Sequence, residues 1–486
     1  MKYLTADAIS EALRGNPVRQ LINGSMVDGA ETLEVINPAT GEACAIAPVA
    51  SLRQLDEAVD AARRSQQSWG GLPLTERRTA LKGLATILRE HVAELAALLT
   101  LEQGRPLAQT EAEVMRAAML LEAMLTIDID DEILREDESG RVILQHKPIG
   151  VVGAIAPWNV PIGLAVPKIT HALYAGNTVV LKPSQYTPLA TLRLGEYASN
   201  LFPPGVLNVL NGGNDLGERI CTHPDIAKIS LTGSVPTGKR VMASAAASLK
   251  RLTLELGGND ACIVRQDADV DKIAPALFAA AFINSGQVCM AIKRLFVHQD
   301  LHERLVEKLG GLAAKAKVGD GFDSTSQMGP VQNRAQYESV KAVLAEVAAD
   351  PAAIIVAGGE ALSRQGFFIA PTVVSGVREG NSLVDKETFG PVLPVLSFQT
   401  DEEAIERANA GSMGLGASVW GNDLKMAEHV ARQLVAGTVW INRHVGVDPL
   451  VPFGGAKESG LGRQFGKAGL LEFTETSALF VPRANK

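Results

Sequence analysis

Cysteine is scarce in this chain. Only four occur in 486 residues, at Cys44, Cys221, Cys262 and Cys289, and no CxxC pair or Cys/His cluster joins them. This spacing argues against a disulfide framework and a structural zinc site, so we expect no metal, and it favours a reducing compartment.

The sequence also shows no long basic segment and no apolar run directly after Met1. The chain has 46 Lys and Arg against 54 Asp and Glu, a net charge of −8, which favours neither nucleic acid nor an anionic membrane as a partner. Acidic residues follow Met1 where a signal peptide needs an apolar run, so we expect the mature chain to begin there and to be cytoplasmic. The apolar stretch 148–166 holds three prolines and Asn159, which predicts a buried strand and loop rather than a membrane span.

The length predicts two or three domains. From Ile149 onward, short apolar strands alternate with helices, and each strand ends in a glycine-rich or polar loop. This pattern predicts a doubly wound parallel sheet that binds ligands at the carboxyl ends of its strands. A second alternating region, 261–440, predicts another α/β domain. A strict G-x-G-x-x-G is absent, and G-S-V-P-T-G at 233–238 has a different spacing, so the ordinary dinucleotide fingerprint is not met.

The first part of the chain reads as scaffold. Residues 1–50 predict irregular structure with short strands, and apolar stripes over 52–62, 81–99 and 111–124 predict three helices that serve core packing. The charged segment 127–147 alternates around a Ser-Gly turn, which predicts a β-hairpin. Such a hairpin is either a solvated excursion or an arm that pairs with another subunit.

Cys289 ends the stretch F-I-N-S-G-Q-V-C, which follows an alanine-rich apolar segment. The abrupt change from apolar to polar and glycine-containing sequence is typical of a helix that ends at a site. A free cysteine is nevertheless most often a small buried hydrophobe. The stretch alone therefore leaves an inert thiol and a nucleophile both open.

Seven motifs occur in order over nearly the whole chain. They are P-W-N at 157–159, L-K-P-S at 181–184, T-G-S at 232–234, E-L-G-G at 255–258, F-I-N-S-G-Q-V-C at 282–289, K-E-T-F-G-P at 386–391 and P-F-G-G-A-K-E-S-G-L-G-R at 452–463. Each motif is weak by itself, but the ordered set closely resembles the aldehyde dehydrogenase superfamily. The resemblance implies oxidation of a small-molecule aldehyde to a carboxylic acid with NAD or NADP.

The resemblance assigns four catalytic residues. The Cys289 thiolate would add to the aldehyde, a hydride would leave to the nicotinamide, and a thioester would remain. The Asn159 amide and the Cys289 N–H would hold the oxyanion. Glu255, otherwise read as a capping or ion-paired carboxylate, would activate water for hydrolysis, and Lys168 would take part in proton transfer. Cys262 fits a packed core thiol.

The cofactor residues follow from the same motifs. Lys182 and Ser184 would contact the adenosine ribose, and Glu387 the nicotinamide ribose. Many NAD-preferring relatives carry a glutamate where this chain has Gln185, whose amide would not repel a 2′-phosphate, so NADP stays open beside NAD. The full expected set is Ile155, Ala156, Pro157, Trp158, Lys182, Ser184, Gln185, Gly217, Gly233, Ser234, Glu255, Leu256, Gly257, Glu387 and Phe389.

Small or apolar side chains are expected around the aldehyde. Because no obvious cationic clamp lines this region, although Arg443 or His444 could contribute, an uncharged apolar or aromatic aldehyde is favoured. A further departure from the family is Gln464, which stands where a carboxylate is common. The expected substrate residues are Val160, Gly163, Leu164, Pro167, Val288, Met290, Val447 and Phe453.

We expect two doubly wound α/β domains and an oligomerisation arm. The cofactor-binding domain takes 1–126 and 148–256, and the catalytic domain 257–440. The arm takes 127–147 and 467–486, with 441–466 as a return segment that closes the active site. The resemblance implies that the arm pairs with a neighbouring subunit, in a homodimer or homotetramer. A CoA-acylating relative, and a non-enzymatic cofactor-binding or structural protein, are the alternatives; Glu255 argues against the first, and the intact Cys289, Asn159 and Glu255 against the second.

Overall fold

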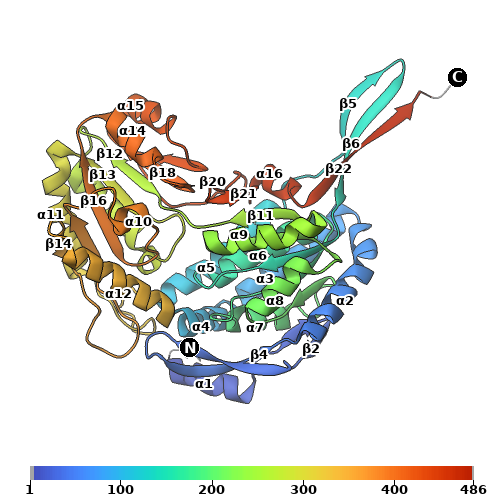
Figure 1. The fold of residues 1–486 in the computed structure, drawn as a ribbon. Coiled ribbons are helices and arrows are strands. Elements are labelled where there is room, and N and C mark those ends of the chain that lie inside the picture. The colour runs from blue at the N-terminus through green and yellow to red at the C-terminus, as the bar shows by residue number, and fades with distance from the viewer. Residues whose placement is uncertain (1–4, 484–486) are drawn as a thin grey trace.

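The computed structural model describes residues 5–483. The predicted start at Met1 and the last three residues of the predicted arm lie outside this range. Two large sheets form two lobes that meet in the middle of the molecule, and a β-hairpin with the C-terminal strand projects from one side (Figure 1). Among the described residues, no helix is long and apolar enough to cross a membrane.

The first lobe is built on an eight-stranded sheet in the order β2-β1-β9-β8-β7-β10-β11-β21. Its five central strands are parallel, while β1, β2 and β21 add antiparallel edges. Strand order reverses between β7 and β10, which creates the switch point where such sheets bind ligands. The strands are β1 (Gln20–Ile22), β2 (Ser25–Val27), β7 (Val151–Ile155), β8 (Thr178–Lys182), β9 (Leu207–Val209), β10 (Ile226–Thr232), β11 (Arg251–Glu255) and β21 (Gly460–Leu461).

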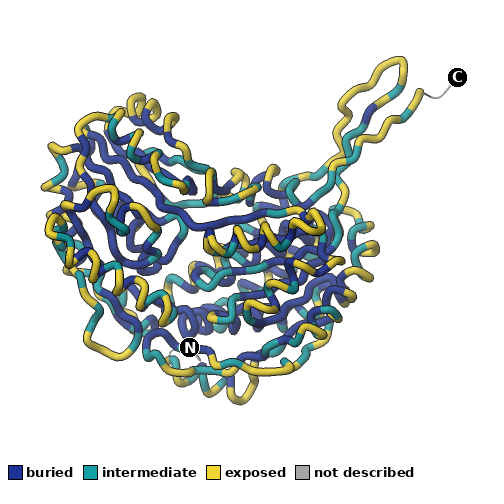
Figure 2. The backbone as a smooth tube through the Cα atoms, in the orientation of Figure 1, coloured by how far each residue is buried: buried dark blue, intermediate teal, exposed yellow. Residues whose placement is uncertain are grey.

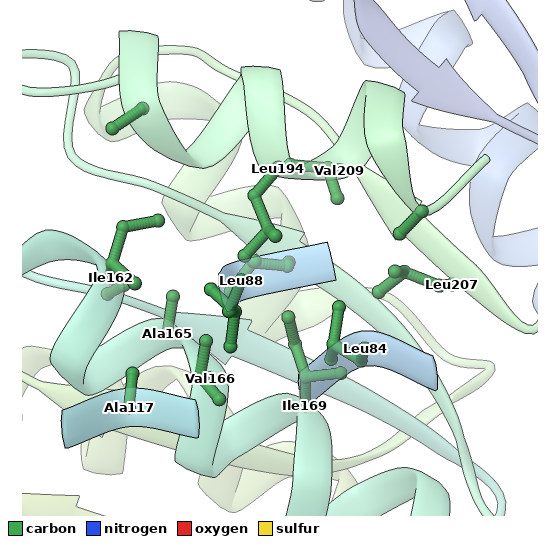
Figure 3. Packing of buried hydrophobic residues seen from close by; sticks show 14 of the residues in the cluster. Leu84, Leu88, Ala117, Ile162, Ala165, Val166, Ile169, Leu194, Leu207 and Val209 are labelled. Atoms are coloured by element: carbon green, nitrogen blue, oxygen red, sulfur yellow. The ribbon is translucent and has the colours of Figure 1, made fainter. Parts of the chain in front are cut away.

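Helices cover this sheet on both faces. Helix α6 is buried along almost its whole surface because helices α3 and α5 and the sheet enclose it, and Figure 3 shows Ile162, Val166 and Ile169 packed against Leu84 and Leu88. The helices of this lobe are α1 (Ala6–Gly15), α2 (Leu52–Gly70), α3 (Leu74–Glu90), α4 (Val92–Gln103), α5 (Leu107–Met124), α6 (Pro161–Tyr174), α7 (Leu189–Tyr197), α8 (Asn214–Thr222) and α9 (Val235–Ala245).

Two local predictions for this lobe were wrong. The stripe over 81–99 spans two helices, α3 and α4, that meet at His91, whose ring stacks on Tyr197 with centroids 3.6 Å apart. The break was invisible in the sequence because the apolar spacing continues through it. The first fifty residues also contain a helix, α1, which Thr5 caps by accepting a hydrogen bond from the Ala8 N–H.

The second lobe is a seven-stranded sheet in the order β14-β15-β16-β13-β12-β18-β19, parallel except for β14. Its strands are β12 (Ala261–Val264), β13 (Arg294–His298), β14 (Ile354–Ala357), β15 (Thr372–Ser375), β16 (Val392–Phe398), β18 (Gly416–Trp420) and β19 (Thr438–Ile441). Its helices are α10 (Val270–Phe282), α11 (Gln299–Lys315), α12 (Arg334–Ala349), α13 (Ser382–Asp385), α14 (Asp401–Asn409) and α15 (Leu424–Ala431). The predicted class of two α/β domains is therefore confirmed.

The predicted hairpin is present as β5 (Glu132–Asp137) and β6 (Gly140–Pro148). Strand β22 (Thr474–Pro482), which follows the short helix α16 (Gly466–Leu471), pairs with β6 of the same chain, with Ala478 opposite Leu144. This arm extends away from both lobes and is largely exposed (Figure 2).

Short ribbons complete the fold. Strands β3 (Glu31–Asn37) and β4 (Glu42–Val49) form one pair, and β17 (Met413–Gly414) and β20 (Ala456–Lys457) form another. The second pair belongs to the path by which the chain returns from the second lobe to β21 on the first.

Candidate active site

A cavity of about 750 Å³ runs along the carboxyl ends of β7, β8 and β10 and reaches Cys289. It lies at the switch point of the first sheet, where loops after neighbouring parallel strands diverge. Every predicted cofactor residue except Glu255 lines it. Further lining residues that the sequence analysis did not assign are Tyr186, Gly213, Asn214, Glu218, Cys221, Leu231, Thr232, Thr237, Arg240, Val241, Ala243, Ser244, Gln336, Ser339 and Thr388.

The start of α9 supplies an anion-binding surface to this cavity. Ser234 caps the helix by accepting a hydrogen bond from the Thr237 N–H at 3.4 Å, and both residues line the cavity. Unpaired N–H groups and the helix dipole favour a negative charge at such a terminus. A pyrophosphate group therefore fits this position.

Lys182, at the end of β8, also lines the cavity. Its buried Nζ donates to the carbonyl oxygens of Gly212 at 2.8 Å and Pro183 at 3.1 Å. An ammonium group has three donors, so one N–H is left for a ligand hydroxyl. Burial lowers the pKa of Lys182 to about 8, against the opposing charge of Asp215.

The loop before Cys289 has a special backbone. Asn284, Ser285 and Gly286 all have positive φ, at 49°, 54° and 75°. A Cβ on Gly286 would lie 2.1 Å from the Gly390 carbonyl oxygen, so only glycine fits there. Left-handed backbone at non-glycine residues costs free energy and persists where surrounding contacts hold it.

Those contacts come from both lobes. The Asn284 amide accepts a hydrogen bond from Gln103 Nε2 at 2.9 Å and donates to the Asn159 carbonyl oxygen at 3.0 Å. The Ser285 hydroxyl donates to the Gly329 carbonyl oxygen at 2.7 Å. The loop is therefore fixed in one geometry, which presents Cys289 to the cavity.

Cys289 is half-buried, and it lines the same cavity as Asn159. The buried Asn159 Nδ2 donates one hydrogen to the Gln287 carbonyl oxygen at 2.9 Å, and its second hydrogen is available to an oxyanion. Burial raises the pKa of Cys289 to about 12, Lys293 opposes this rise, and Glu387, Asp260 and Glu255 add to it. With this raised pKa, the Cys289 thiol is protonated at neutral pH.

Glu255 ends β11 and is buried without a hydrogen-bond partner on either carboxylate oxygen among the described residues. Burial raises its pKa to about 8, while Lys168 and Arg463 oppose the rise. The carboxylate faces the return segment, since a Cβ on Gly454 would lie 3.0 Å from its Oε1. This orientation explains why Glu255 alone among the predicted cofactor residues does not line the cavity.

Lys168 shares this buried region with Glu255. Its Nζ lies 3.4 Å from the Ser230 hydroxyl and is the largest opposing charge on Glu255. Burial lowers the pKa of Lys168 to about 8, although Glu255 acts to raise it. Burial thus disfavours the charged form of both groups, while the charge of each favours the charged form of the other.

Cys289 belongs to a small cluster of apolar side chains. Three predicted substrate residues, Met290, Val447 and Phe453, join Cys289 in it. The other predicted substrate residues lie on α6, at its N-cap or just before Cys289. Gly163, within α6, donates its N–H to Glu113 Oε1 at 2.8 Å, and Val160 is the N-cap of the helix. Leu164 is half-buried, and Pro167 and Val288 are buried. The cluster also contains Leu120, Met124, Leu415 and Phe465.

Leu120 and Met124 come from α5, which the sequence analysis assigned to scaffold alone. Their apolar spacing fits core packing and the site wall equally well, so no sequence signal separated the two roles. His444 is no cationic clamp: its ring lies 2.7 Å from the Ser418 hydroxyl and 3.1 Å from the Met290 carbonyl oxygen. Burial lowers the pKa of His444 to about 3, so the ring is neutral.

The fold has two α/β lobes, and the cavity, which Cys289 lines, lies at the switch point of the first sheet. The model of the aldehyde dehydrogenase family matches residues 26–479. This chain belongs to that family.

Individual aldehyde dehydrogenases are also similar to this chain in sequence and in structure. A phenylacetaldehyde dehydrogenase of Pseudomonas fluorescens is 39% identical over 482 residues, with 96% of each chain covered. An NAD+ complex of a Bacillus cereus aldehyde dehydrogenase superposes with a TM-score of 0.92 at 36% identity, covering 97% of this chain and 98% of that one. A betaine aldehyde dehydrogenase of Staphylococcus aureus in complex with NAD+ has a TM-score of 0.94 at 31% identity, covering 100% and 98%.

Proposed function

We propose that this protein oxidises an aldehyde to a carboxylic acid with NAD or NADP, using Cys289 as the nucleophile. The proposal depends on one observation: Cys289 and Asn159 line the same cavity as the predicted cofactor residues. The cavity fits a dinucleotide, because a helix N-terminus and a buried lysine with a spare N–H line it. A bound nicotinamide would supply the hydride acceptor.

The chain's own residues would do the remaining chemistry. Cys289 Sγ attacks the carbonyl carbon after its proton has left, and the Asn159 amide and the Cys289 N–H hold the developing oxyanion. Glu255, at the end of β11, takes the proton of the hydrolytic water after its side chain turns toward the cavity. Lys168 Nζ exchanges a proton with Glu255.

Release by water is preferred over transfer to coenzyme A. A buried carboxylate without a hydrogen-bond partner and with a pKa near 8 has the properties of a general base. This favours the hydrolytic assignment, and the kinetics of a Glu255→Gln variant test it.

We propose an uncharged apolar or aromatic aldehyde as the substrate. The cluster beside Cys289 is built from Met124, Phe453 and Phe465 with other apolar side chains, and the nearby His444 is neutral. The phenylacetaldehyde dehydrogenase among the relatives supports an aromatic substrate. A panel of aliphatic, aromatic and charged aldehydes, assayed by kcat/KM, tests this; preference for a carboxylate-bearing aldehyde would contradict it.

Cofactor choice should depend on Gln185. Gln185 and Arg240 both line the cavity, together with Lys182, which is proposed to contact the adenosine ribose. We therefore expect the protein to use NADP as well as NAD, and Gln185→Glu to lower kcat/KM for NADP by about tenfold or more through repulsion of the 2′-phosphate. Parallel kinetics with both cofactors measure this. Gln336→Glu, elsewhere on the cavity wall, is the charge-matched control; an equal loss with both variants would contradict a specific role.

The arm is proposed to join copies of this chain into a homodimer or homotetramer. Ile133, Leu134, Leu479 and Phe480 expose large apolar side chains on it, with Phe480 at 69% exposure. We expect sedimentation velocity to give two or four times the 51.4 kDa chain mass, and Phe480→Asp to shift the distribution toward monomer. A stable wild-type monomer at micromolar concentration would contradict the proposal.

We also propose that 1–126 and 148–256 form the cofactor-binding domain and 257–440 the catalytic domain, with 441–466 as the segment that closes the site, and that the protein is cytoplasmic. Four free cysteines support a reducing compartment. The cavity is proposed to take small molecules only, without nucleic acid or membrane as partner.

A further inference from the structure

A buried lysine lies directly behind the nucleophile. Lys293 is only 4% exposed, and its Nζ donates a hydrogen bond to the Val288 carbonyl oxygen. This carbonyl belongs to the same peptide unit as the Cys289 N–H. The lysine therefore holds the peptide group whose other end is the proposed oxyanion donor.

The same ammonium group also reaches the cofactor side of the cavity. Lys293 Nζ lies 3.8 Å from Glu387 Oε1 and 5.5 Å from the centroid of the Phe389 ring. Glu387 Oε1 in turn accepts a hydrogen bond from the Gly258 N–H at 3.2 Å. Lys293 thus bridges the peptide of Cys289 and the carboxylate that lines the proposed nicotinamide end of the cavity.

Two electrostatic effects follow from this placement. A cation at a peptide carbonyl polarises the peptide unit, and hydrogen bonds in such a chain strengthen one another, so the Cys289 N–H becomes a better donor. A positive charge near a thiol also favours its thiolate. Lys293 is the cation that opposes the raised pKa of Cys289, whereas Glu387, Asp260 and Glu255 add to the rise.

We propose that Lys293 is a positioning residue that orients and polarises the Val288–Cys289 peptide unit, favours the thiolate of Cys289, and couples both to Glu387. This inference rests on the proposed function of Cys289. The charged and titratable groups that face Lys293 are Glu387, Asp260 and His444. His444 is neutral and burial raises the pKa of Asp260 to about 8, so Glu387 is the carboxylate that forms the ion pair with the lysine.

The test compares Lys293→Met, Lys293→Gln and Lys293→Arg with the matched control Lys250→Met. Lys250 is also a buried lysine that donates to backbone carbonyl oxygens, those of His223 and Ile226, but it precedes β11 at the end opposite Glu255. The first readout is the rate of Cys289 alkylation by iodoacetamide between pH 6 and 10, without cofactor, followed by mass spectrometry. The second is the pair kcat and KM for NAD+.

We expect Lys293→Met and Lys293→Gln to slow alkylation at pH 8 about tenfold, because loss of an adjacent opposite charge raises a thiol pKa by about one unit or more. Lys293→Arg keeps the charge and should alkylate within about threefold of the wild type. In the neutral variants kcat should fall about tenfold as the oxyanion donor weakens, and KM for NAD+ should rise. Lys250→Met should alkylate at the wild-type rate.

Equal alkylation rates in the wild type and in a folded Lys293→Met variant would overturn the proposal. Faster alkylation would also overturn it, because a merely structural loss exposes the thiol. If Lys293→Met does not fold, equal rates in Lys293→Gln and Lys293→Arg would overturn it in the same way. A wild-type protein that oxidises no aldehyde would defeat the proposed function instead, and the alkylation rates would still decide the influence of Lys293 on Cys289.

Discussion

Cys289→Ala is expected to lower aldehyde oxidation by roughly 10⁵-fold, the scale of losing a catalytic nucleophile. The variant keeps the cavity and the Cys289 backbone N–H but has no sulfur to add to the carbonyl. Steady-state formation of the reduced cofactor with an aromatic aldehyde measures the loss. Titration of NAD+ binding should give a dissociation constant close to that of the wild type, because no cofactor contact is removed.

Cys262→Ala is the matched control. Cys262 lies on β12 with no exposed surface, next to Ser418 and Trp420. It should keep kcat within a few fold of the wild type while it lowers the melting temperature, because a small cavity opens in the core. Comparable losses of activity in both variants would contradict the assignment of Cys289, as would rapid alkylation of Cys262.

Glu255→Gln is expected to separate the two halves of the reaction. Reduced cofactor should form in a burst of about one equivalent per active site, after which the steady rate falls about 10³-fold, because general base catalysis of thioester hydrolysis is lost. Rapid-mixing absorbance of the reduced cofactor measures both phases. The acyl group should remain on Cys289 and be visible by mass spectrometry.

In the wild type, the rate of thioester hydrolysis should also depend on the protonation state of Glu255. Burial raises its pKa to about 8, and a general base acts only when deprotonated, so hydrolysis should rise as pH increases through about 8 and level off above it. The Glu255→Gln variant should not show this rise of the hydrolysis rate with pH. Glu102→Gln should keep it: Glu102 is equally buried and its pKa is also raised to about 8, but it accepts hydrogen bonds from the Leu189 and Ala190 N–H groups away from the site.

Undiminished acid formation by Glu255→Gln would defeat the hydrolytic assignment. A second experiment adds coenzyme A to the wild-type protein. Formation of an acyl-CoA at a rate above that of acid would favour the acylating alternative, in which a thiol resolves the thioester.

The fold class followed from the sequence because short apolar strands each ended in a polar or glycine-rich loop. The same rule brought Asn159, Gly233 and Ser234 to one sheet edge, since the carboxyl ends of parallel strands meet there. Family motifs added Cys289 and Glu387, which come from the other lobe and which no local pattern would have joined to the first.

The sequence did not reveal site residues whose side chains also serve core packing or that lie outside the motifs. Met124 and Leu120 pack as any apolar helix stripe does, and only the tertiary fold turns them toward Cys289. Gln336 and Ser339 line the cavity from α12 without belonging to any motif. Lys293 reads as an ordinary charged residue before a strand, and its burial depends on the folding of the loop that carries Cys289.

The way the chain returns to the first sheet restricts how the two lobes can move. Strand β21 pairs with β11 at Leu254 and Glu255, and the preceding ribbon β20 pairs with β17 of the second lobe. Hinge opening between the lobes would have to break these backbone ladders and the hydrogen bond from the Leu256 N–H to the Ser459 carbonyl oxygen. We therefore expect the frame around the site to stay assembled during a turnover, with conformational steps made by individual side chains such as Glu255.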